Sequence, residues 1–254
     1  MVKLFADGVI EAFTAALLAP YSTDPGTRGL LDYSPQELDR IVTLLDKRGW
    51  PMMIHAIGDA AVRDTLDAFE HAAAVNPAPP KGRRHRVEHI ETIDPADVPR
   101  FGALGVIASM HPEGWTGAPL AESLIGVWAA NLGPVRVARN GAWAPVTKAG
   151  GRVIIGSDWP AAGYEAIPRL YAVASPAASA GNPAAQLSMA AAVEAYTRGP
   201  VYAAFDDDVK GTLAPGMLAD IVVLSADIFT PPLPPVATVS VAATIFGGKV
   251  VYRK

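Results

Sequence analysis

The stretch WPMMIHAIGD, from Trp50 to Asp59, constrains the fold of this chain more than any other. It predicts a buried strand that ends on His55, a tight turn at Gly58 and a helix that opens on Asp59, whose carboxylate can accept from the free N–H groups of the first turn. A histidine at the carboxyl end of a parallel strand lies where α/β barrels have their active sites. A core histidine bonded to a neighbour is the other interpretation, and this residue alone does not decide between them.

The same arrangement returns further along the chain. Apolar and β-branched runs predict strands over residues 86–90, 105–111 and 152–158, and helical stretches separate these strands. Strands that alternate with helices form a parallel sheet, in which all carboxyl ends lie on the same face. We therefore expect four side chains to converge there: His55, His89, His111 and Asp158.

Three imidazoles and a carboxylate are residue types that suit a divalent metal ion. Core histidines placed by chance explain one such residue but not this set. We therefore predict that His55, His89 and Asp158 belong to a metal site. We interpret His111, which precedes Pro112, as lining the substrate pocket rather than as a ligand.

The two remaining histidines are interpreted as lying outside the site. His71 falls within the helix that follows His55 and is predicted to be a surface residue. His85 lies in the basic run from Lys81 to Arg86, which we interpret as a solvated approach to the strand.

Turn and capping signals place the other elements. A capping box from Ser34 to Glu37 predicts a helix that closes at Arg48-Gly49, and Asp94-Pro95 predicts a short helix through Leu104. Further expected elements are helices over 59–74 and 189–196 and strands over 239–246 and 249–252, the last two joined at Gly247-Gly248 as a hairpin.

Composition excludes several classes of function. Of the 254 residues, 50% are hydrophobic and 18% are charged, and the net charge of -4 gives no reason to expect a nucleic-acid partner. The absence of cysteine rules out disulfides and Cys-based zinc sites and suits the cytoplasm. Lys3 and Asp7 interrupt any signal peptide, and Pro176 and Gly181 argue against a membrane span, so we expect a soluble, cytoplasmic protein without a membrane partner.

Six motifs follow one another along the chain: VKLFADG (2–8), HAIGDAAV (55–62), RVEHIET (86–92), GSDWP (156–160), AYTRGP (195–200) and GTLAPGMLADIVVL (211–224). Together they resemble the carboxyl-terminal part of an amidohydrolase-superfamily enzyme, specifically of amidohydrolase family 3, the group that includes N-substituted formamide deformylases. The motifs span nearly the whole chain, and none of them identifies a substrate.

The resemblance implies an α/β fold with two domains. Residues 1–205 would form a partial TIM-like (β/α) barrel, about strands 4 to 8, that carries the metal-dependent hydrolase site. Residues 206–254 would form the small antiparallel β unit typical of amidohydrolases.

The resemblance also implies roles for individual residues. Lys3, His55, His89 and Asp158 would bind a divalent metal, for which zinc is the expectation, and Asp158 would be the catalytic proton acceptor. Lys3 matches a lysine that such enzymes can carboxylate; an ordinary solvated lysine near a chain terminus is the alternative.

Substrate contacts are placed at His111, Trp115 and Trp159. Substrate choice would lie in the segment from Glu113 to Lys148, whose tryptophans Trp115, Trp128 and Trp143 form either an apolar pocket wall or ordinary packing.

The chain departs from the family pattern because it has no His-x-His pair and starts where strand four should be ending. We expect a metal-dependent hydrolase that acts on an amide or related C–N bond of a small molecule and assembles as a homo-oligomer, since an open half-barrel exposes a strand edge. The alternative is a truncated, catalytically impaired fragment that acts only as an oligomeric or binding protein. A serine hydrolase is discounted, because Gly156-Ser157-Asp158 is too short to supply a nucleophile elbow.

Overall fold

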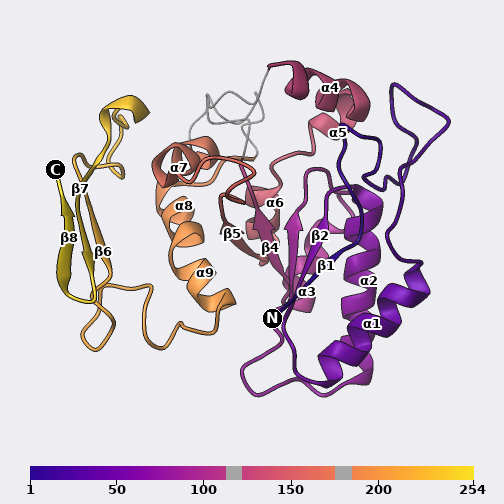
Figure 1. Cartoon of the computed structure of the whole chain (residues 1–254), viewed down its shortest axis with the longest axis horizontal. Helices are drawn as coiled ribbons and strands as arrows, with labels where there is room; N and C mark the ends of the chain where they lie inside the picture. The colour runs from indigo at the N-terminus through magenta and orange to yellow at the C-terminus, as the bar shows by residue number, and fades with distance from the viewer. Residues whose placement is uncertain (113–121, 175–184) are drawn as a thin grey trace.

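The computed structural model describes residues 1–112, 122–174 and 185–254, and its first part is built around a parallel sheet (Figure 1). Each strand pairs with the next one along the chain, in the order β1-β2-β3-β4-β5, which is the order of consecutive strands in a (β/α) barrel. The carboxyl ends of the strands therefore lie along one side, as predicted. The strands are β1 (Val2–Phe5), β2 (Met52–Ala56), β3 (Arg86–His89), β4 (Ile107–Met110) and β5 (Arg152–Ile155).

The first two helices form where the sequence predicts them. α1 (Pro35–Lys47) begins with a complete capping box: the Glu37 N–H donates to the Ser34 hydroxyl oxygen at 3.3 Å, and the Ser34 N–H donates to the Glu37 carboxylate at 3.0 Å. α2 (Asp59–Val75) packs against both α1 and β2. The apolar faces of these helices cover one side of the sheet.

The third helix begins later than predicted. α3 spans Val98–Leu104 with Asp97 at its N-cap, whereas the sequence suggested a start at Asp94. Asp94 instead closes the turn before the helix, since its carboxylate accepts the Ala96 N–H at 3.0 Å and its carbonyl accepts the Asp97 N–H at 2.9 Å. Aspartate stabilises a turn of this kind as well as it caps a helix, which is why the pattern is ambiguous.

Within the residues that the structure describes, six further α-helices lie before and after β5. α8 and α9 pack against β5, and the Ser188 hydroxyl caps α8 by accepting the Ala191 N–H, which confirms that predicted helix. Within the described residues, no helix has the length and apolar character needed to cross a membrane. The six are α4 (Glu122–Leu132), α5 (Pro134–Val137), α6 (Trp143–Lys148), α7 (Ala166–Ala174), α8 (Met189–Tyr196) and α9 (Arg198–Ala203).

A small antiparallel sheet follows, drawn in yellow at one end of the molecule in Figure 1. Gly247 and Gly248 both have positive φ, 55° and 78°, as a two-residue hairpin turn requires, so the predicted hairpin is confirmed. Ile228 and Val239 are buried in the same apolar cluster as the residues of the first sheet. The elements are β6 (Ile221–Leu224), the 3-10 helix η3 (Val236–Thr238), β7 (Val241–Phe246) and β8 (Lys249–Arg253).

Two apolar clusters position the carboxyl side of the sheet. The larger one lies between the strands and their helices and includes Ile54, Val87 and Phe69. The smaller one joins the long segment between β1 and α1 to α4, through Ile10, Leu17, Tyr21, Ile57, Trp128 and Leu132. This second cluster fixes the segment over the ends of the strands, where the candidate site lies.

At the amino end of the strands, the prediction that His85 is solvated is wrong. His85 is 3% exposed, stacks on Phe69 with ring centroids 4.8 Å apart, and has Nε2 3.0 Å from a carboxylate oxygen of Asp46. The Met52 N–H donates to its Nδ1, so Nε2 carries the proton and donates to Asp46. Arg83 donates to the same oxygen at 2.8 Å. The basic run thus supplies a buried ion cluster, which periodicity alone does not reveal.

Replacement of Asp46 by alanine is expected to lower the free energy of unfolding by about 3 kcal/mol, because it leaves His85 and Arg83 without their shared buried acceptor. Urea unfolding followed by circular dichroism measures this. Asp208→Ala is the matched control, since its ion pair with Lys81 is exposed and worth less than about 1 kcal/mol. Equal stability of the two variants would contradict the assigned role of Asp46.

Candidate active site

A pocket of about 500 Å³ lies at the carboxyl ends of the parallel strands. Four elements bring the predicted residues to it: Lys3 comes from β1, His55 from β2, His89 from the end of β3, and His111 from just after β4. Asp158 reaches it from the loop that follows β5. The structure therefore brings together the residues that the sequence predicted to converge.

The three histidines form a row along the pocket wall. The ring centroids of His55 and His89 are 4.3 Å apart, and those of His89 and His111 are 4.8 Å apart. Nε2 of His111 lies 3.4 Å from a carboxylate oxygen of the buried Glu88, which orients this ring. Within the described residues, no three His, Asp or Glu side chains form a ready-made set of metal ligands.

Burial favours the uncharged form of the two imidazoles of His55 and His89. It lowers the pKa of His89 to about 2, an effect that the neighbouring His111, His55 and Lys3 reinforce. Burial also lowers the pKa of His55 and of Lys3, and for Lys3 the charges of Glu88 and Asp158 partly oppose this. Neutral imidazoles are the form that binds metal ions, so the chemistry of this donor set fits a divalent cation.

The tautomer of His55 follows from its contact with the main chain. Nε2 lies 3.0 Å from the carbonyl oxygen of Gly8, which can only accept, so Nε2 carries the proton. In the neutral ring this leaves Nδ1 as the nitrogen with a lone pair. The contact thus fixes which nitrogen of His55 can serve as a ligand.

The backbone is strained where the strands end. His89, Ile90 and Asp158 all have positive φ, of 76°, 57° and 52°, and all three line the pocket. A β-branched residue such as Ile90 rarely adopts this conformation. Strain of this kind persists only where the surrounding structure enforces it, and it commonly marks functional sites.

Asp7 holds the backbone next to the site in place, and sequence reasoning did not identify it as a site residue. It is 1% exposed, and its two carboxylate oxygens accept the N–H groups of Ala16, Ile57 and Gly58 at 2.8 to 2.9 Å. Burial raises the pKa of Asp7 to about 7, and these three N–H groups oppose the rise. A sequence signal for this role was available: in the motif VKLFADG, Asp7 follows a predicted strand and directly precedes a glycine.

The turn between β2 and α2 is hydrogen-bonded to the segment between β1 and α1. The N–H groups of Ala60 and Ala61 donate to the carbonyl oxygen of Ala16, and the carboxylate of Asp59 accepts the Leu18 N–H at 2.8 Å. A Cβ at Gly58 would lie 1.9 Å from the same carbonyl oxygen of Ala16, so only glycine fits there. Otherwise unpaired N–H groups at the start of α2 are thereby satisfied.

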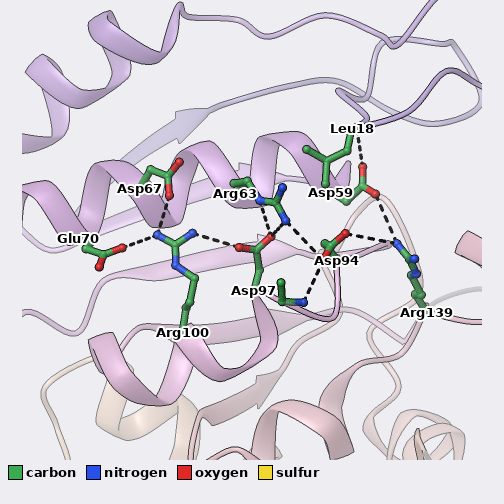
Figure 2. A network of polar contacts seen from close by, with 10 residues as sticks. Leu18, Asp59, Arg63, Asp67, Glu70, Asp94, Asp97, Arg100 and Arg139 are labelled. Atoms are coloured by element: carbon green, nitrogen blue, oxygen red, sulfur yellow. Dashed lines mark hydrogen bonds and ion pairs between the residues drawn. The ribbon is translucent and has the colours of Figure 1, made fainter.

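An ion-pair network holds in place the segment after α5, which forms another wall of the pocket (Figure 2). Arg139 lies between Asp59, at 4.0 Å, and Asp94, at 3.8 Å. Asp97 pairs with Arg63 and Arg100, which joins α3 to α2. Arg139 directly precedes residues 140–143, so the network fixes the segment that supplies Asn140, Gly141 and Trp143 to the pocket.

Glu91, two residues after His89, also lines the pocket and was missed by sequence reasoning. The indole N–H of Trp128 donates to its carboxylate at 2.6 Å, and the side chain of Asn140 donates to its carbonyl oxygen at 2.8 Å. Its position in the RVEHIET motif, just past a strand-terminal histidine, was the signal that could have identified it.

The predicted tryptophan contacts differ in their placement. Trp128 and Trp143 are buried and also line the pocket, so they serve both as packing and as pocket wall. Trp159 is 66% exposed and is not among the lining residues, so the structure does not bring it to the site. Trp115 lies outside the described residues.

Comparison with known sequences identifies relatives along the whole chain. The sequence model of the amidohydrolase family matches residues 1–252. Protein LONG AFTER FAR-RED 3 of Arabidopsis thaliana is 32% identical over an alignment of 256 positions that covers 99% of this chain and 42% of that protein. A second relative, from Bacillus subtilis (strain 168), is 27% identical over 263 residues, 47% of its length. The chain thus spans less than half the length of these curated relatives.

Two solved structures of metal-dependent hydrolases resemble the fold of this chain. An uncharacterized metal-dependent hydrolase from Pyrococcus furiosus superposes with a TM-score of 0.71 at 25% identity, over 85% of this chain and 42% of that one. A second uncharacterized metal-dependent hydrolase, from Pyrococcus horikoshii OT3, gives a TM-score of 0.70 at 27% identity with the same coverage.

Replacement of Asp7 by alanine is expected to lower the free energy of unfolding by about 3 kcal/mol, because three buried N–H groups lose their shared carboxyl acceptor. The amides of Ala16, Ile57 and Gly58 should exchange faster in hydrogen-exchange experiments. Asp24→Ala is the control, since the carboxylate of this exposed aspartate of the same segment accepts the Gly26 N–H at the surface. Unchanged exchange in the Asp7 variant would refute the anchoring role.

Proposed function

Because the chain belongs to the amidohydrolase family, we propose that it forms the metal-binding part of a hydrolase that cleaves an amide or related C–N bond of a small molecule. The observation that carries this proposal is the meeting of Lys3, His55, His89 and Asp158 in one pocket, from four separate strands or the loop that follows one of them. Relatives in solved structures that are themselves metal-dependent hydrolases support it.

The residues that would hold a divalent ion are Lys3, His55, His89 and Asp158. His55 would bind through Nδ1, the nitrogen that its contact with Gly8 leaves unprotonated. When bound, the ion polarises a carbonyl group and lowers the pKa of a water molecule to about 7. Burial of Lys3 favours its uncharged amine, which is the form that carbon dioxide can carboxylate.

Asp158 is proposed to move the proton. It is exposed at the mouth of the pocket, so its carboxylate can accept a proton from the attacking water and give it to the leaving nitrogen. His111, held by Glu88, would donate a hydrogen bond to the substrate carbonyl. Both roles need only the residues that already face the cavity.

Two finer parts of the proposal are zinc as the ion, which rests on the sequence resemblance, and a homo-oligomeric state, which rests on the exposed strand edge of a partial barrel. The competing proposal is a binding protein without catalysis, and metal content separates the two.

Protein purified without added metal is expected to contain close to one equivalent of a divalent ion, and the His55→Ala, His89→Ala double variant is expected to lose it. Inductively coupled plasma mass spectrometry gives the content. His71→Ala is the control, because its side chain is exposed and lies outside the pocket. A wild-type protein that carries no ion and binds none on titration would leave the binding-protein proposal in its place.

Asp158→Asn is expected to lower kcat by about 100-fold or more on a panel of formamides and simple amides, because asparagine cannot accept the proton. Its metal content should stay near that of the wild type, since three ligands remain. Steady-state assays and metal analysis of the same preparation test this together. A variant with unchanged kcat would remove Asp158 from the mechanism.

A further inference from the structure

The segment from Asn140 to Trp143 forms one wall of the pocket. Asn140, Gly141 and Trp143 all line the cavity. Arg139, directly before them, is held by two ion pairs with aspartates of other segments (Figure 2). Since this wall is fixed before a ligand binds, a ligand can pair with its polar groups at little cost in conformational freedom.

The indole N–H of Trp143 is a donor without an acceptor. The residue is 4% exposed, and within the described ranges its Nε1 has no hydrogen-bond partner. Gly141 lies against the edge of the ring that carries this N–H, because a Cβ on Gly141 would come within 2.8 Å of Cζ2 and 3.3 Å of Cε2, the carbon bonded to Nε1. Gly141 itself lines the cavity, so the N–H lies beside the cavity. Buried polar groups are almost always paired, and an orphaned donor at this place therefore indicates a ligand that accepts from it.

Asn140 adds an acceptor to the same wall. Its Nδ2 donates to the carbonyl oxygen of Glu91 at 2.8 Å. A carbonyl oxygen can only accept, so this contact fixes which end of the Asn140 side chain is the NH₂ group. The other end is Oδ1, which accepts no hydrogen bond from the residues that the structure describes. The wall thus offers one donor, at Trp143, and one acceptor, at Asn140.

A neutral amide matches this pair better than a charged group does. An amide has a carbonyl oxygen that can accept from Trp143 and an N–H group that can donate to Asn140. An ammonium group has no acceptor for the indole N–H, and a carboxylate has no donor for Oδ1. A polar group that a ligand leaves unpaired inside a pocket loses hydrogen bonds to water without replacement, so a mismatched ligand binds less well.

The pocket has room for such an amide beside the one that reacts. Its volume of about 500 Å³ lies within the range of pockets that hold whole small molecules, about 300–1,000 Å³. Val9, Ile57 and Ile125 add apolar lining. A short hydrocarbon chain between two amide groups therefore suits the cavity.

We propose that Trp143 and Asn140 bind a second, neutral amide group in the part of the substrate that does not react. The indole N–H donates to the carbonyl oxygen of this group, and Oδ1 of Asn140 accepts from its N–H. The substrates would then be diamides, in which a short hydrocarbon chain joins the amide that is cleaved to the amide that is recognised. This inference rests on the proposed function, because it names the substrate class of the same pocket.

Three series of formamides of matched shape test the preference. The formamide nitrogen carries a chain of one to three methylene groups, and the chain ends in a carboxamide, a methyl ketone or an isopropyl group. The carboxamide can pair with both residues, the ketone with Trp143 alone, and the isopropyl group with neither. Release of formate measures cleavage of the formamide bond in every case.

At the chain length that fits best, the wild-type kcat/KM is expected to be about tenfold or more higher for the carboxamide than for the isopropyl compound, with the ketone between them. Trp143→Phe keeps an aromatic ring but has no N–H, and it is expected to reduce this ratio to about twofold or less. Trp50→Phe is the matched control, since Trp50 is 52% exposed, precedes β2 and lies outside the pocket.

Equal kcat/KM values for the carboxamides and the isopropyl compounds at every chain length would overturn the inference and leave the hydrolase proposal intact. A folded Trp143→Phe variant that keeps the wild-type ratio would overturn it as well. Should this variant fail to fold, the wild-type series and a binding measurement decide.

Nuclear magnetic resonance of the indole N–H groups provides that measurement without turnover. The chain has five tryptophans, and each indole signal is assigned by its absence from the corresponding tryptophan-to-phenylalanine variant, or by elimination. In Asp158→Asn protein labelled with nitrogen-15 tryptophan, the carboxamides are expected to shift the Trp143 signal downfield, because the N–H gains an acceptor, and the isopropyl compounds are not.

A downfield shift in a protein that hydrolyses none of the compounds would support this inference and count against the hydrolase proposal. No shift with any carboxamide, or the same shift with the isopropyl compounds, would overturn the inference whatever the activity.

Discussion

Three backbone N–H groups that converge on the carboxylate of Asp7 organise the carboxyl side of the sheet. They come from two distant parts of the chain, the segment at Ala16 and the turn at Ile57 and Gly58. Because the carboxylate is buried, removal of any one partner leaves a polar group that water cannot reach. The position of the His55 ring and the start of α2 both depend on this contact, since each is bonded to the segment that Asp7 holds.

Much of this arrangement could be predicted from the sequence, because local rules decide it. The capping box at Ser34, the glycine hairpin at Gly247 and the apolar runs before His55 and His111 each specify an element within a few residues. Parallel order then places the ends of the strands together without knowledge of any long-range contact. The family motifs added two proposed roles that periodicity does not reveal, Lys3 as a metal ligand and Asp158 as the proton acceptor.

What the sequence could not predict depends on contacts between distant residues. His85 looked solvated because it lies in a basic run, yet Asp46, 39 positions earlier, supplies the buried acceptor. Glu91 was not identified as a pocket residue, because its contact with Trp128, 37 positions later, exists only in the folded chain. Trp159 follows a site aspartate directly, but the positive φ of Asp158 accompanies a turn of the chain that leaves the ring in solvent.

The ion pairs of Arg139 with Asp59 and Asp94 affect how small molecules approach the pocket. With that guanidinium engaged outside the cavity, the carboxylates of Glu11 and Glu91 contribute a negative potential to the pocket that they line. In salt at physiological concentration such a field decays over about 8 Å, so it would act on a cation only during the last part of its diffusion to the pocket. Ionic strength would then change how fast charged molecules arrive more than how fast neutral ones do.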